Sequence, residues 1–84
     1  MDTDSICSAL TAAAARLDLH GEVLQGRAAV IARQRDTMRW RSLGARACRA
    51  RVEAVLRLLL ATTTRLTDAG DDLRRCSMRL ANAP

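Results

Sequence analysis

Large aliphatic residues recur every seven positions in two long stretches of the chain. In the first stretch, Ala14, Gly21 and Ala28 each follow a large residue by four positions. The large residues of that stretch are Leu10, Leu17, Leu24, Ile31 and Met38. In the second stretch, the sevenfold series comprises Ala45, Val52, Leu59, Leu66, Leu73 and Leu80. Such repeats are typical of helices that pack along a common line of contact, the seam.

The second stretch contains a further row of small or apolar residues. This row follows the large series by three positions and comprises Cys48, Val55, Thr62, Ala69 and Cys76. The two rows form an a/d heptad pattern, and Leu56 widens it, as expected for a helix within a bundle. We therefore predict helices over residues 5–38 and 44–80, joined by a turn at 39–43.

The two sevenfold series are mirror images about the middle of the chain. Leu17 and Leu66 lie equally far from a point between residues 41 and 42. The pairs Leu10 and Leu73, Leu24 and Leu59, Ile31 and Val52, and Met38 and Ala45 share that relation. Antiparallel helices would bring each pair to one level, whereas a single continuous helix would not need this symmetry. We predict an all-α antiparallel hairpin with arms about 50 Å long.

Polar residues predict where both helices begin and where the second one ends. Asp4 or Ser5 can cap the first helix and Ser42 the second, because their side-chain oxygens accept hydrogen bonds from free backbone N–H groups. Asn82 and Pro84 are expected to end the second helix.

The first helix has a second apolar stripe opposite the seam, at about 100° of rotation per residue. Its members are Ala12, Ala15, Leu19, Val23, Gly26 and Val30. Tolerated surface residues are one explanation, since single exposed apolar side chains are common. The other is a partner surface that completes a four-helix bundle, which the small size of the chain favours. The partner could be a second copy or a different small helical protein.

Composition argues against several classes of function for this 84-residue chain. Aromatic residues make up 1 %, too few for a platform that stacks single-stranded bases. No apolar run approaches the roughly 20 residues that span a bilayer, and no signal peptide is recognisable. His20 and the three cysteines show no metal-ligand spacing, and no catalytic motif is present. We expect neither enzymatic activity nor a cofactor.

Positive charge gathers around the predicted turn. All fourteen basic residues are Arg, and nine of them lie in residues 27–57 against Asp36 and Glu53, a balance of +7. A solvated surface is one explanation, and nucleic-acid phosphate, anionic lipid or an acidic partner are others. Helices of about 35 residues lack the short recognition helix of a helix-turn-helix motif, so nucleic acid is not the favoured partner.

Two cysteines are expected to face each other at the open end of the hairpin. Cys7 and Cys76 share the mirror relation of the seam residues. A disulfide between them would close a loop of about 70 residues and could add roughly 4 kcal/mol. Two buried free thiols are the alternative, because antiparallel helices often hold their Cα atoms too far apart. Cys48 is expected to be a core residue.

The middle of the chain contains Trp40-x-Ser42-x-Gly44-Ala45, followed by an Arg- and Ala-rich helix. Trp40 can cover the end of the seam, and Gly44 can relax the backbone there. In its length, turn position and helical arms, the chain resembles the WxG-type hairpins of type VII secretion, the early-secreted-antigen family. The likeness is to the actinobacterial W-x-S-x-A-A variant, although the Gly stands four positions after the Trp instead of two.

This resemblance implies a non-enzymatic protein that binds a second helical chain as an antiparallel four-helix dimer. It also implies secretion without a signal peptide, or a cytoplasmic location before export, and a larger secreted toxin or effector as a further partner. The family's export signature, Tyr and then Asp or Glu four positions later, is missing because the chain has no Tyr. The alternatives are a basic nucleic-acid-binding helical dimer and a non-secreted adaptor or chaperone for a larger secreted protein.

Overall fold

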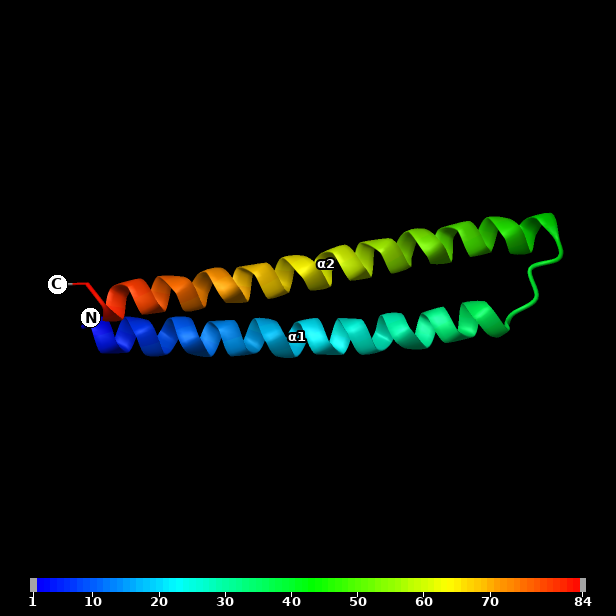
Figure 1. Cartoon of the computed structure of the whole chain (residues 1–84). Helices are drawn as coiled ribbons and strands as arrows, with labels where there is room; N and C mark the ends of the chain where they lie inside the picture. The colour runs from blue at the N-terminus through cyan, green and yellow to red at the C-terminus, as the bar shows by residue number, and fades with distance from the viewer. Residues whose placement is uncertain (1, 84) are drawn as a thin grey trace.

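Two long antiparallel helices make up the fold (Figure 1). The computed structural model describes residues 2–83, in which helix α1 spans Thr3–Thr37 and helix α2 spans Leu43–Ala81. No strand occurs among these residues. The rod measures 65 × 16 × 14 Å, with both chain ends at one end and the turn at the other. The predicted all-helical hairpin is confirmed, and the helix limits lie close to those expected.

Helix α1 begins earlier than the capping pattern predicted. The cap is Asp2, whose carboxylate accepts a 2.7 Å hydrogen bond from the backbone N–H of Ser5. This hydrogen bond lowers the pKa of the Asp2 carboxyl, so the cap is an anion at neutral pH. Asp4, one of the two expected caps, instead lies in the first turn, where a negative charge also favours the positive end of the helix dipole.

Helix α2 begins and ends as predicted. The Ser42 hydroxyl accepts a 3.0 Å hydrogen bond from the backbone N–H of Ala45, which confirms Ser42 as the cap. At the other end, the backbone N–H of Asn82 contacts the carbonyl oxygens of Leu80 and Met78. Pro84, the other expected stop residue, lies outside the described residues.

The turn is held to α1 by its tryptophan. The indole N–H of Trp40 donates a 2.8 Å hydrogen bond to the carbonyl oxygen of Arg35, and the ring is half-buried. Such a bond satisfies one of the carbonyl groups left unpaired at a helix end. Gly44 does not relax the turn as expected, because it lies inside α2 and no described glycine has a positive φ.

Small residues let the helices approach each other closely. Ala14, Gly21 and Ala28 are the buried residues of α1. A Cβ atom added to Gly70 of α2 would lie 3.6 Å from the Ala14 carbonyl oxygen, and one added to Gly21 would lie 4.0 Å from the Leu66 Cβ. The helices are closest beside Gly70, where an added Cβ would also lie 3.2 Å from the Asp18 carboxylate, whereas a Cβ at Gly21 would make ordinary van der Waals contacts.

The row of α2 that packs beside this seam differs from the predicted one. We expected the residues three positions after the large series to be covered, but Cys48, Val55 and Cys76 are exposed. The row with the better cover follows the large series by four positions and comprises Leu56 and Gly70, which are buried, and Thr63 and Ser77, which are half-buried. We term it the covered row. The small side chains in this row match the small row of α1, which allows closer contact. Cys48 is therefore a surface residue and not the core residue that we predicted.

Met38 does not join the seam. Helix α1 ends at Thr37, and Met38 has an extended backbone that leaves its side chain 56 % exposed. Because the helix ends one residue before Met38, Met38 does not continue the helical spacing that places the other large residues of α1 at the seam. The other predicted seam residues are half-buried, namely Leu10, Leu17, Leu24, Ile31, Val52, Leu59, Leu66 and Leu73.

Candidate interaction surface

The hairpin leaves the large aliphatic residues of its seam in partial contact with water. No large side chain among residues 2–83 is fully buried, and the most enclosed is Leu56, at 6 % exposure. Two helices cannot surround a side chain on all sides, because each contact covers only one stripe of a helix. The seam residues therefore form one side of a hydrophobic core, and the hairpin itself has no further helices to cover the other side.

Helical geometry places the half-buried rows on one side of the hairpin. In each helix the row of large residues follows the row packed at the seam by three positions. The large side chains therefore point about 60° away from the seam. Because the helices are antiparallel, equal turns point to the same side of the pair. We term this the open apolar side. It comprises Leu10, Leu17, Leu24 and Ile31 of α1 and Val52, Leu59, Leu66, Leu73 and Leu80 of α2.

Three further residues extend the open apolar side along the edge of α2. Val55 is 48 % exposed, and Thr62 and Ala69 are half-buried. They belong to the row that heptad spacing had assigned to the seam. The sequence did contain a signal for this surface. The row with Val55, Thr62 and Ala69 lies beside the large residues of α2 on the side away from α1, and so widens the apolar surface beyond the seam.

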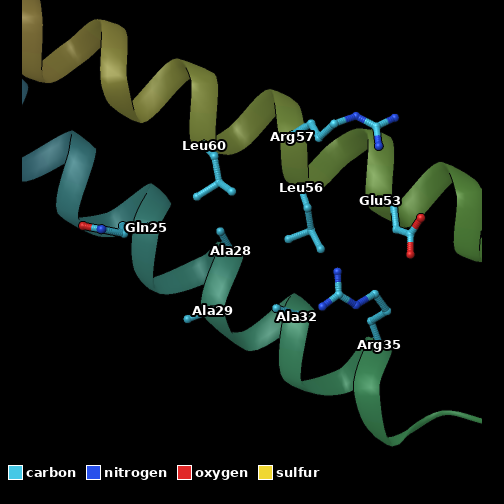
Figure 2. A pocket seen from close by; sticks show the side chains of 9 residues that line it. All are labelled: Gln25, Ala28, Ala29, Ala32, Arg35, Glu53, Leu56, Arg57 and Leu60. Carbon is cyan, nitrogen blue, oxygen red and sulfur yellow. The ribbon is translucent and has the colours of Figure 1, made fainter.

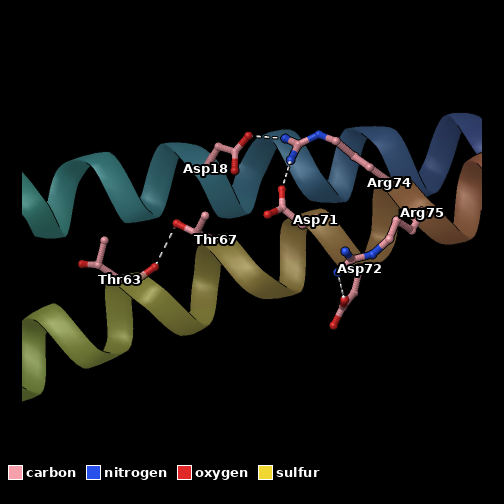
Figure 3. A network of polar contacts seen from close by, with 7 residues as sticks. All are labelled: Asp18, Thr63, Thr67, Asp71, Asp72, Arg74 and Arg75. Atoms are coloured by element: carbon pink, nitrogen blue, oxygen red, sulfur yellow. Dashed lines mark hydrogen bonds and ion pairs between the residues drawn. The ribbon is translucent and has the colours of Figure 1, made fainter.

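The opposite side of the hairpin is polar towards the open end (Figure 3). There the Arg74 guanidinium pairs with Asp18 of α1 and, at 3.3 Å, with Asp71 of its own helix. The Thr67 hydroxyl donates to the carbonyl oxygen of Thr63 at 3.1 Å. Asp18 and Arg74 form the one ion pair between the helices of residues 2–83, and both are partly exposed. Exposed pairs contribute about 1 kcal/mol or less, so this pair adds little to the stability of the hairpin.

A groove of about 470 Å³ lies between the helices on the polar side, nearer the turn (Figure 2). Its floor is apolar, with Ala28 and Ala32 of α1 and Leu56 of α2. Arg57 and Glu53 stand at its rim (Figure 2). This lining offers hydrophobic contact together with the charges of Glu53 and Arg57.

The partner face predicted on α1 is exposed along its whole length. Its members are Ala12, Ala15, Leu19, Val23 and Val30, and none is covered by α2. Leu19 is the most exposed of the large ones. A shallow hollow beside Gly26 is lined by Val23, Val30 and Ile31. The hairpin thus presents two apolar surfaces, this outer face of α1 and the open apolar side.

In the structure Cys7 contacts Ser77, and not the Cys76 that was expected to face it. Cys7 is half-buried, and its thiol donates to the carbonyl oxygen of Ser77 at 3.3 Å. The Ser77 hydroxyl in turn lies 3.4 Å from the carbonyl oxygen of Cys7. Cys76 is exposed, and both thiols are free. Ser77 is therefore the residue across the seam from Cys7. Of the two alternatives, the structure has the free thiols, although Cys76 is exposed and not buried as that alternative expected.

Counting thiols in denatured, non-reduced protein tests that disulfide. Because Cys7 contacts Ser77 and all three thiols are free in the structure, we expect the purified protein to show three free thiols. Mild oxidation should then leave Ser77→Cys, and not the parent protein, with a Cys7 cross-link, because position 77 faces Cys7 directly. A cross-link between Cys7 and Cys76 in the parent protein would contradict this expectation.

No group of three His, Cys, Asp or Glu residues able to hold a metal ion occurs among the described residues. His20 is exposed on α1. In the described part of the chain, neither helix has an apolar stretch long enough to cross a membrane.

Comparison with family models, curated proteins and solved structures finds no match to this chain. The resemblance of the Trp40-x-Ser42-x-Gly44 turn to WxG-type hairpins therefore stays a prediction. What the geometry itself provides is a hairpin with two apolar surfaces, a polar region towards the open end and a basic turn end.

Proposed function

We propose that this chain is a non-enzymatic binding protein that packs its open apolar side against another helical chain in a four-helix bundle. The observation that supports this most is the partial exposure of every large residue in that surface, from Leu10 to Leu80. A second helical layer would remove these rows from water, at about 25 cal/mol for each Å² of apolar surface. Contiguous apolar surface of this extent is typical of an interface.

The uneven charge of the hairpin favours a second copy as the partner, packed head to tail. Residues 27–57, next to the turn, have nine Arg and two acidic residues, a balance of +7. Since the whole chain has a net charge of +5, the residues towards the open end sum to −2. A head-to-tail pair places the basic half of each copy beside the weakly acidic half of the other, whereas a parallel pair would juxtapose two basic halves.

The turn supports a more specific role for this binding. Trp40 donates a hydrogen bond to the end of α1, and Ser42 caps the following helix, in the order found in the W-x-S-x-A-A variant that the chain resembles. We propose that the dimer belongs to the WxG-type substrates or partners of type VII secretion. Export in a strain with and without that secretion system would test this role, and equal amounts outside both strains would contradict it.

The mass of the purified protein in solution tests self-association. Sedimentation equilibrium should give twice the 9.2 kDa of one chain at micromolar concentration. The dimer should persist in high salt, because burial of apolar surface is not screened as surface ion pairs are. A helical protein that stays at 9.2 kDa at every concentration would contradict the choice of a second copy.

A further inference from the structure

The turn end of the hairpin exposes more apolar surface than a solvated loop needs. Leu43 is 83 % exposed, the highest value among the large hydrophobic residues described, and Met38 on the other side of the turn is also exposed. Trp40 lies between them and is half-buried. The turn that joins α1 to α2 lies at the end of the rod opposite both chain ends (Figure 1).

Unpaired arginines surround these apolar side chains. Arg39 and Arg41 alternate with Met38 and Trp40 in the sequence, and Arg46 lies in the first turns of α2. Within the described residues these three arginines make no ion pair and are exposed, whereas Arg35 and Arg49 are paired. Residues 37–52 include no Asp or Glu. The turn end is thus a cationic surface with an apolar tip.

A bilayer that contains anionic lipid has the matching chemistry. Apolar side chains enter the boundary between headgroups and acyl chains, while nearby cations bind the negatively charged headgroups. Guanidinium groups pair with phosphate through two parallel hydrogen bonds. Nucleic acid would match the charge but would leave Leu43 and Met38 in water, which makes lipid the better fit.

We propose that the turn end docks on the surface of an anionic bilayer, with Met38 and Leu43 inserted and Arg39, Arg41 and Arg46 bound to headgroup phosphates. The contact is peripheral, because the tip is only a few residues long. The tip lies outside the open apolar side, so docking on a bilayer does not compete with the proposed dimer for that surface. In a head-to-tail dimer the two tips would lie at opposite ends.

Trp40 is the single Trp of the chain and therefore reports on the tip directly. The full-length protein would be titrated with vesicles of phosphatidylcholine alone and of phosphatidylcholine with phosphatidylglycerol. With the anionic vesicles we expect Trp40 fluorescence to shift to shorter wavelength and to be quenched by brominated acyl chains. With phosphatidylcholine alone we expect binding about 100-fold weaker, because the electrostatic contribution of several arginines is lost.

Variants of the arginines and of the apolar tip residues test whether binding depends on the turn end itself or only on the net charge of the protein. Arg39→Gln, Arg41→Gln and Arg46→Gln combined should weaken binding to anionic vesicles about 100-fold. Arg16→Gln, Arg65→Gln and Arg79→Gln remove the same charge from exposed positions away from the tip, and should weaken binding only a few-fold. Met38→Ser with Leu43→Ser should weaken binding about tenfold and abolish the fluorescence shift, whereas Leu58→Ser should do neither.

Three results would overturn the proposal. The first is equal loss of binding in the two arginine sets, which would indicate net charge alone. The second is binding to anionic vesicles with no change in Trp40 fluorescence or quenching. The third is tight, salt-sensitive binding to duplex DNA through the tip arginines with no binding to vesicles, which would assign the surface to nucleic acid.

Discussion

Replacing Val55 and Ala69 with glutamate should convert the associated protein into separate hairpins that remain helical. Both residues lie along the α2 edge of the open apolar side, Val55 exposed and Ala69 half-buried, and neither belongs to the covered row of α2. In the proposed dimer they would be enclosed by the second copy, and two carboxylates would then lose their water without gaining a partner. We expect the association constant to fall about 100-fold or more. Sedimentation equilibrium with circular dichroism would measure mass and helicity together.

Two matched pairs of substitutions make this result specific. Leu58→Glu with Ala61→Glu adds the same charge to the exposed outer surface of α2 and should leave the dimer intact. Leu19→Glu with Val23→Glu tests the outer face of α1, which sequence patterning had assigned to the partner. Loss of association in that pair, with a dimer retained in Val55→Glu with Ala69→Glu, would place the partner on α1 and contradict the open apolar side.

The Leu56→Glu variant should fail to fold. Leu56 is the most enclosed large side chain of residues 2–83 and stands on the floor of the groove in Figure 2. Glutamate there loses the apolar contacts and brings a charge into the seam, which costs about 3–5 kcal/mol. That loss is comparable to the whole stability of many small domains, about 5 kcal/mol at the low end. We expect most of the circular dichroism signal of the helices to disappear.

Leu60→Glu is the matched control for this experiment. It lines the same groove one helical turn further along, but its side chain is exposed. We expect a change in unfolding free energy of about 0.5 kcal/mol or less, as is usual for surface positions. The variants must be compared at one protein concentration, because association stabilises the folded state. A folded Leu56→Glu variant with ordinary stability would show that the seam does not hold the hairpin together.

Much of the fold could be predicted because its governing interactions are local or periodic. The α2 cap at Ser42 depends only on residues within one turn. The mirrored heptads required a reversal near the middle, and the turn at residues 38–42 lies there. At the start of α1, Asp2, Asp4 and Ser5 are all suitable caps, and their sequence alone does not rank them. The structure uses Asp2, so the helix begins two residues earlier than predicted, an addition of about half a turn.

By itself, the sequence determined two long helices, their antiparallel pairing and a basic turn, since helix periodicity and charge are properties of residue order. Only the tertiary structure decided which row of α2 packs against α1. A heptad repeat allows either the row three positions after each large residue or the row four positions after it to pack at the seam. The sequence therefore does not decide between Thr62 and Thr63, or between Ala69 and Gly70. The row with Gly70 is covered because its small residues let the backbones approach Ala14 and Gly21. That choice turns the large residues towards one side of the hairpin, where a partner can cover them.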